Sequence, residues 1–252
     1  MRKKSYGYLL LFAVSLFFLA IAGCKKKDYF IDSGRHSADY NGTVLQYLKN
    51  HSLRQFDSLT KVIRLAGMEN VFENESITFF ATPDTMINRS VKALNQNLFS
   101  LGRDTISDLS QLKPAFWKKQ LSMYLFKGER RLKDYTQVDP GMLQTFPGQY
   151  YQSYDGKTML VGVIFNDAGG VRYAGYRQLM ISYFSGNVPP TGVLPYVNMV
   201  ASSDIHPTNG IIHALQWSNE RLGTGSNRLN TPYMGFSEND FITDAKQIGL
   251  DF

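Results

Sequence analysis

The spacing of the apolar residues changes near Gly128, and this change restricts the possible folds more than any other feature of the sequence. Before Gly128, apolar residues recur every three or four positions, as on one face of a helix. After it, short apolar stretches alternate with turn signals such as Asp155-Gly156 and Gly169-Gly170, as between strands. Because the helices come first and the strands later, we expect an α+β domain.

The helical half contains recognisable start and stop signals. Thr43 has the position of an N-cap, and Ser52 with Gln55 has the spacing of a capping box. Gly67 offers a C-terminal stop. The expected helices cover residues 43–48, 52–67, 84–97 and 111–126, and a short buried strand is expected at 77–81.

The second half predicts further strands and a separate tail. Residues 223–227 have the composition of a flexible linker, and Ser237 is placed to cap a short helix after it. We therefore expect residues 219–252 to be a linker and a tail that is available to a partner. The expected strands cover residues 143–146, 150–154, 159–165, 179–184, 196–202 and 211–217.

The N-terminus has the three parts of a secretory signal peptide. A basic start is followed by an apolar run over residues 8–22 and then by Ile21-Ala22-Gly23-Cys24. This last stretch resembles the bacterial lipobox, although Leu is usual where Ile21 stands. The resemblance implies removal of residues 1–23 and lipidation of Cys24, which is the single cysteine. An uncleaved anchor helix and a buried free thiol are the alternatives.

Cleavage would leave a lipid-anchored protein with little net charge. Each buried methylene of an acyl chain contributes about 0.8 kcal/mol to membrane binding. We therefore expect a partner membrane, in the cell envelope and at the outer membrane, with polar residues 24–42 as the tether. The formal charge of +6 falls to about +3 once the three basic residues of the signal peptide are gone. The remaining basic residues are scattered, so no nucleic-acid partner is expected.

Three blocks of sequence, in this order, resemble a fasciclin domain. They are residues 77–84, residues 121–128, and residues 203–214 with their Asn-Gly turn and apolar strand. The resemblance covers residues 43–218. It implies that helices of the N-terminal half pack on a β-sheet wedge from the C-terminal half. The positions that match the family's structural motif are Thr78, Phe80, Asn209, Gly210 and His213.

The third block has a physical interpretation of its own. Asn209-Gly210 favours positive backbone dihedrals and a tight turn into the following strand. His213 lies in an apolar strand, so we expect a buried, hydrogen-bonded imidazole; the alternative is a metal ligand, with His206 as the one nearby histidine.

The chain departs from the fasciclin pattern in its central helix. Many relatives have a Tyr-His pair there, which is tied to integrin adhesion in animals. Tyr124 is present, but no histidine lies between His51 and His206. The resemblance therefore does not carry that role to this chain.

A second departure is an insertion at about residues 145–200, and it is rich in tyrosine. Tyrosine is favoured at binding surfaces because it provides a large contact area at low entropic cost. Ordinary cross-strand packing is the alternative. The candidate binding surface consists of Tyr150, Tyr151, Tyr154, Tyr173, Tyr176, Tyr183 and Tyr196.

The sequence contains no recognised catalytic motif. It has no nucleophile elbow, zinc-protease motif or phosphate-binding loop. The carboxylates of Asp139 and Asp155 could form a pair only if the fold brought them together, and Asp204 is expected to stabilise its turn. We expect no enzyme activity, cofactor or metal.

Three functional hypotheses follow. The first is a non-catalytic envelope lipoprotein that mediates adhesion or binds a protein or ligand. The second is an accessory subunit of an outer-membrane nutrient-import complex that binds a glycan or a peptide. The third is a hydrolase with an unrecognised carboxylate site.

Overall fold

The computed structural model describes residues 38–184, 194, 196–218 and 230–251. The predicted signal peptide and Cys24 lie outside these ranges. The helices are α2 (Val44–Lys49), α3 (Asp57–Leu65), α4 (Glu69–Asn74), α5 (Asp84–Ser100), α6 (Pro114–Ser122) and α7 (Glu238–Asp244), with short helical turns η2 (Leu109–Gln111), η3 (Leu132–Asp134) and η4 (Ala245–Gly249). The strands are β1 (Ile77–Ala81), β2 (Leu125–Lys127), β3 (Gln149–Gln152), β4 (Thr158–Phe165), β5 (Arg177–Tyr183), β6 (Tyr196–Ile205) and β7 (Gly210–Leu215).

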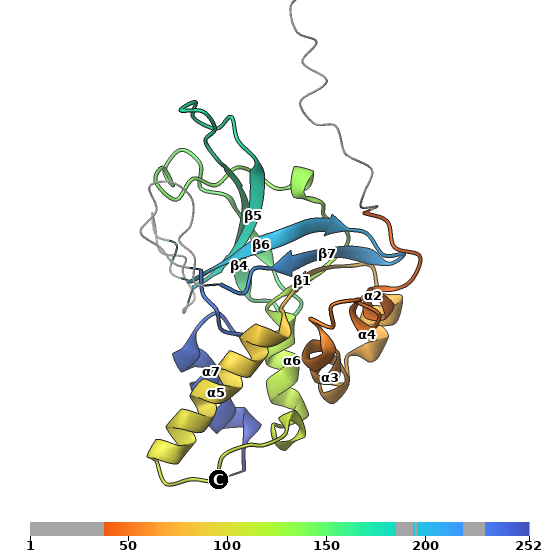
Figure 1. The fold of residues 1–252 in the computed structure, drawn as a ribbon, viewed down its shortest axis with the longest axis vertical. Helices are drawn as coiled ribbons and strands as arrows, with labels where there is room; N and C mark the ends of the chain where they lie inside the picture. Colours follow the sequence, from red (N-terminus) through yellow and green to blue (C-terminus); the bar gives the residue numbers. More distant parts are fainter. Residues whose placement is uncertain (1–37, 185–193, 195, 219–229, 252) are drawn as a thin grey trace, which may run out of the picture. The chain divides into compact units, whose positions relative to one another are not determined.

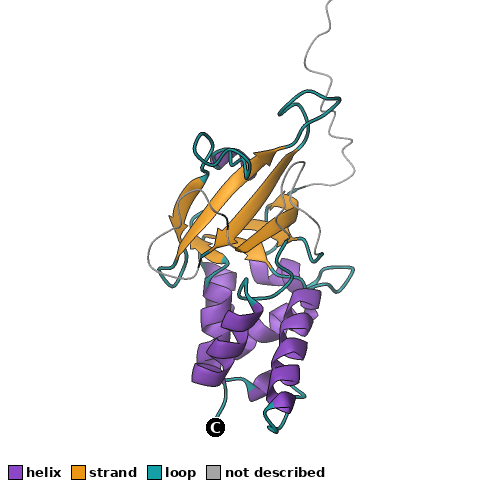
Figure 2. Ribbon diagram, turned by 90° about the vertical axis from the view of Figure 1, so that its left-hand side faces the viewer, coloured by secondary structure: helices purple, strands orange, loops and turns teal. Residues whose placement is uncertain are grey.

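The strands of the described residues form one sheet in the order β2-β1-β7-β6-β5-β4-β3. Neighbouring strands are antiparallel, except that β1 and β7 run parallel. Within residues 38–251 the helices gather on one side of the strands (Figures 1 and 2). The predicted α+β class is confirmed, with helices of the N-terminal half packed against strands that come mainly from the C-terminal half.

Of the two expected caps in the helical half, one forms. The Thr43 hydroxyl accepts the N–H of Gln46 at 3.2 Å, and the Gln46 side chain accepts the N–H of Thr43 at 2.9 Å. This capping box starts α2. The capping box predicted for Ser52 and Gln55 is wrong, because α3 begins only at Asp57.

The start of α3 is capped from a distant part of the chain instead. The carboxylate of Asp84, at the start of α5, accepts the N–H groups of Ser58 at 2.9 Å and Leu59 at 3.1 Å. These N–H groups have no partner within their own helix. Partial burial nevertheless raises the pKa of the Asp84 carboxyl above its usual value. No local pattern in α3 could reveal this cap, because its acceptor lies about 25 residues further along.

The helix predicted over residues 111–126 is wrong at its C-terminal end. Helix α6 stops at Ser122, and the chain then forms β2, which pairs antiparallel with β1. The apolar residues at 124–126 continue the helical spacing, so periodicity alone does not show the stop. β1 needs a hydrogen-bonding partner along this edge, and β2 provides it.

The strand predicted over residues 143–146 is also wrong. The N–H groups of Thr145 and Phe146 both donate to the carbonyl of Met142 at 2.9 Å, which makes a turn. The remaining predicted strands are confirmed with small shifts of their ends. The six-residue helix α4 has no counterpart among the expected helices.

Asn209 joins three segments of the chain. Its Oδ1 accepts the N–H of Val44, in the first turn of α2, at 2.8 Å. Its Nδ2 donates to the carbonyls of Phe72 at 3.2 Å and Glu75 at 3.1 Å, at the end of α4. One amide side chain thus satisfies backbone groups at two helix ends beside the start of β7.

Gly210 is required by close packing and not by its backbone angles. It does not have the positive φ that the turn interpretation predicts, so that prediction is wrong. A Cβ atom at this position would lie 2.3 Å from the carbonyl oxygen of Ile77, on the parallel neighbour β1. Only a residue without a side chain allows this approach of the two strands.

Residues 230–251 belong to the core, so the prediction of a separate tail is wrong for them. Phe236 and Phe241 are fully buried. The ring of Phe236 stacks on Tyr124 with centroids 4.6 Å apart, and Phe241 packs edge-on against Phe116 at 5.0 Å. Ser237 caps α7 as predicted. The expected linker over residues 223–227 lies outside the described residues.

The packed part of the chain also begins earlier than expected. The N–H of Tyr40 donates to the carbonyl of His206 at 2.8 Å, and the N–H of His206 donates to the carbonyl of Ala38 at 2.6 Å. Residues 38–42 therefore pair with the end of β6 and are not part of a free tether.

Candidate functional site

The tyrosines of the expected binding surface do not form one exposed patch. Tyr150 is 45% exposed and Tyr176 is 63% exposed, whereas Tyr183 is only 7% exposed and lies in the core. Tyr150 is opposite Leu160 in the sheet, and Tyr176 bonds to Asn166 at the other end of β4. At about 3.3 Å per residue, these two positions are separated by roughly 20 Å along β4.

The other four tyrosines are partly buried and mostly act as internal contacts. The hydroxyl of Tyr154 donates to the carboxylate of Glu75 at 3.0 Å, and the hydroxyl of Tyr173 donates to Asp139 at 2.7 Å. Tyr151 packs edge-on against Tyr135, and Tyr196 stacks on Tyr183. Cross-strand and loop packing therefore accounts for most of this set.

The residues that match the fasciclin motif make one structural junction. The Thr78 hydroxyl accepts the N–H of Arg130 at 2.9 Å, and Phe80 packs on the His213 ring at 5.0 Å. His213 is fully buried; its Nε2 donates to the carbonyl of Arg130 at 3.0 Å, and its Nδ1 accepts the N–H of Asp204 at 3.3 Å. Burial lowers the pKa of His213 to about 4, so the imidazole is neutral at pH 7.

The carboxylates considered for catalysis are held by separate partners. Asp139 is bound by the Tyr173 hydroxyl described above. Asp155 accepts the hydroxyl of Ser153 at 2.6 Å within a turn, and Asp204 accepts the N–H of Leu132 at 2.6 Å. In the described ranges no three acidic, histidine or cysteine side chains are grouped as metal ligands.

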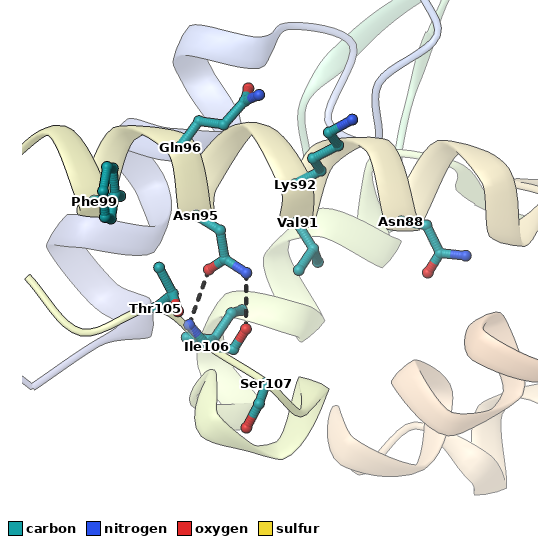
Figure 3. Close-up of a pocket in the computed structure, with 9 residues that line it drawn as sticks. All are labelled: Asn88, Val91, Lys92, Asn95, Gln96, Phe99, Thr105, Ile106 and Ser107. Atoms are coloured by element: carbon teal, nitrogen blue, oxygen red, sulfur yellow. Dashed lines mark hydrogen bonds between the residues drawn. The ribbon is translucent and has the colours of Figure 1, made fainter.

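A hollow with a volume of about 510 Å³ lies along α5. Its second wall is the segment Thr105–Ser107, which Asn95 holds against the helix (Figure 3). The Asn95 Oδ1 accepts the N–H of Ile106 at 2.9 Å, and its Nδ2 donates to the carbonyl of Ile106 at 2.8 Å. We call this hollow the α5 groove.

The α5 groove is lined by one exposed aromatic side chain. Phe99, near the end of α5, is 79% exposed. Val91 points from α5 toward the second wall, whereas Lys92 points away from that wall, from the opposite side of the helix (Figure 3). Lys92 is the one charged side chain among the described residues that line the groove.

Sequence reasoning missed this groove for a specific reason. The buried face of α5 is formed by residues such as Met86, Leu94 and Leu98. Phe99 comes directly after Leu98 in the chain, so the helical turn directs its side chain away from the core. An aromatic residue outside the buried face was the available signal, but nothing in the sequence places Thr105–Ser107 beside it.

Similar proteins were found among solved structures, but not among protein-family models or curated proteins. No protein-family model matches the chain, and no curated protein matches it. Among solved structures, the chain is similar to the FAS1 domain pair of the insect cell adhesion molecule Fasciclin I, with 16% identity and a TM-score of 0.47. The match covers 79% of this chain but only 52% of that one. A similarity of this size does not transfer that protein's role to this chain.

No helix in the part of the chain that the structure describes is both long enough and apolar enough to cross a bilayer.

Proposed function

We propose that this chain is a lipid-anchored protein of the bacterial cell envelope that binds a partner protein and catalyses no reaction. The observation that carries the proposal is the α5 groove with its exposed Phe99. A large exposed aromatic side chain beside an open hollow is typical of sites that bind other proteins.

The anchor is proposed from the sequence. Ile21-Ala22-Gly23-Cys24 resembles a lipobox, and Lys25, Lys26 and Lys27 would lie next to the lipid head groups. Tethering a binding module to a membrane raises its effective concentration there, so that even weak contacts are occupied. The proposed location is the outer membrane.

The proposed occupant of the α5 groove is a partner segment that carries apolar side chains and a nearby carboxylate. Val91 and Phe99 provide apolar contact area, and burial of such area drives association. Lys92 lies at the edge and has no ion pair among the described residues. An acidic residue beside the apolar segment would pair with it.

A second candidate function is that of an accessory glycan- or peptide-binding subunit of an outer-membrane import complex. It is favoured by the exposed rings of Tyr150, Tyr176 and Trp217, since aromatic side chains are enriched where proteins bind their partners. Purification of the native complex tests it: a co-purifying transporter would support this function, and an isolated monomer would contradict it.

The first proposal is tested by photo-crosslinking in the native envelope. A photoreactive phenylalanine analogue is placed at position 99 of the full-length chain, and in a control at position 53, where Leu53 is 70% exposed. We expect one defined adduct with another protein from position 99 and none from position 53. The substitution Lys92→Glu should greatly reduce this adduct.

Three outcomes would contradict the proposal. Equal labelling from both positions, or none from position 99, would show that the α5 groove binds no protein there. An adduct with twice the mass of the chain would instead assign the groove to a second copy of the same protein.

A further inference from the structure

A second, smaller pocket lies between α6, α7 and the ends of β4 and β5, and we call it the α7 pocket. Its volume is about 180 Å³, and it is more enclosed than the α5 groove. Side chains of both charges line it: Lys119, Lys157, Asp240 and Asp244. It shares no lining residue with the α5 groove, so the two sites are separate.

The acidic side of the α7 pocket includes one carboxylate, that of Asp240, with no ion pair among the described residues. Asp240 and Asp244 are four residues apart on α7 and so share one face of the helix. Asp244 is fully engaged, because its oxygens accept Lys119 at 2.7 Å and Gln120 at 2.9 Å. In contrast, the Oδ2 atom of Asp240 is buried and has no hydrogen-bond partner among the described residues.

An unpaired buried carboxylate oxygen lowers the free energy of unfolding, because it loses its hydrogen bonds to water and gains none in the protein. Burial without a hydrogen bond disfavours the charged form of a carboxyl group. Burial and the neighbouring charge of Asp244 indeed raise the pKa of Asp240, and Lys157 and Lys119 only partly oppose this effect. Asp240 lines the pocket, so an ammonium group placed there would pair with the charge of this carboxylate.

The basic side of the α7 pocket offers an unused donor. The ammonium group of Lys157 lies 3.3 Å from the hydroxyl of Tyr183 and 5.0 Å from the centre of its ring. The ion pairs of the described residues do not include Lys157. Two of its three N–H donors therefore remain available to an anionic group.

The wall between these two groups is rigid and aromatic. Tyr183 packs against Phe236 at 5.8 Å and against Tyr196 at 6.2 Å, which fixes its ring. Gly235 also lines the pocket, and it has no room for a side chain because Oε1 of Gln120 occupies the place of a Cβ atom. This Oε1 atom is itself buried and without a partner in the described residues.

We propose that the α7 pocket binds a small zwitterion, with its ammonium group on Asp240 and its carboxylate on Lys157. The lining charges balance, since Lys119 pairs with Asp244 and Lys157 opposes Asp240. A neutral zwitterion preserves this balance, whereas a simple amine or a simple acid leaves one buried charge unpaired.

The size of the pocket limits the ligand to the dimensions of a free amino acid. A dry cavity of about 150 Å³ holds one benzene molecule, and drug-sized ligands need about 300 Å³ or more. A pocket of about 180 Å³ therefore suits a molecule only slightly larger than benzene. Thr243 is a further residue that lines the pocket.

The test is calorimetric titration of the purified full-length protein with free amino acids. Each amino acid is compared with the acid that lacks its amino group and with the amine that lacks its carboxylate. We expect saturable binding of at least one amino acid, and at least tenfold weaker binding of both matched compounds. Asp240→Asn and Lys157→Met should each weaken binding at least tenfold.

Matched controls separate binding from folding. Asp104→Asn and Lys118→Met change the same residue types at exposed positions outside the pocket and should leave the affinity unchanged. The melting temperature of each variant without ligand shows whether it is folded. Because Asn has the shape of Asp and removes a poorly solvated charge, Asp240→Asn should not lower it.

Three results would overturn the proposal. The first is the absence of binding by every amino acid, which would mean that the pocket holds only water. The second is equal affinity for an amino acid and its matched amine or acid. The third is unchanged affinity in folded Asp240→Asn and Lys157→Met variants.

Discussion

Replacing Asn209 with alanine should destabilise the whole domain, because this side chain is bonded to three backbone groups from two helix ends. It accepts the N–H of Val44 and donates to the carbonyls of Phe72 and Glu75. Each of these hydrogen bonds contributes about 1 kcal/mol net. The expected loss in the free energy of unfolding is therefore about 3 kcal/mol.

This loss should be measurable in two ways. For a domain of this size, each kcal/mol lowers the melting temperature by about 2–4 °C, so Asn209→Ala should melt roughly 6–12 °C below the wild type. In urea, the midpoint should fall while the slope m stays constant, because the surface exposed on unfolding is unchanged. Circular dichroism at 222 nm follows both transitions.

The control is Asn88→Ala, at an exposed position on α5. Surface substitutions of this kind change stability by about 0.5 kcal/mol or less. If Asn209→Ala melts within 2 °C of Asn88→Ala, then water replaces the three bonds without loss, and the structural role assigned to Asn209 is refuted.

Three further predictions concern the tail, the buried histidine and the anchor. A chain that ends at Gly223 lacks Phe236 and Phe241 and should be unfolded by circular dichroism and sensitive to protease; a cooperative transition would contradict this. Because burial lowers the pKa of His213 to about 4, the unfolded chain binds its proton first, so stability should fall as the pH drops from about 6.5 to 4. In urea titrations over this range, His213→Gln should lose less stability than the wild type, and equal losses would argue against the assignment. Cys24→Ala should abolish acylation, measured by labelling with palmitate, and normal labelling of this variant would exclude Cys24 as the lipidated residue.

Several features that depend on neighbours in the chain were predicted from the sequence. The N-cap predicted at Thr43 forms because its partner, Gln46, lies within one helical turn. The helix 84–97 and most strands were found because their apolar spacing repeats over several residues. His213 was expected to be buried and hydrogen-bonded because its strand neighbours are apolar, and this is confirmed.

Where a feature depends on distant residues, the sequence did not predict it or predicted it wrongly. Helix α6 stops at Ser122 although its apolar spacing continues, because β1 requires a paired edge. The cap of α3 comes from Asp84, and the tail is part of the core because the ring of Phe236 stacks on Tyr124. The tyrosine-rich segment suggested a binding surface by composition, but packing leaves only some of these rings exposed.

The sequence by itself therefore determined the α+β class and most of the elements, and it predicts the lipid anchor. These follow from short-range periodicity, from local hydrogen bonds and from a linear motif near the N-terminus. Only the tertiary structure decided which side chains are exposed and which come together, such as Lys157 and Asp240 around one pocket. The physical reason is that contacts between segments far apart in the chain arise from packing the whole core, which no local window of sequence contains.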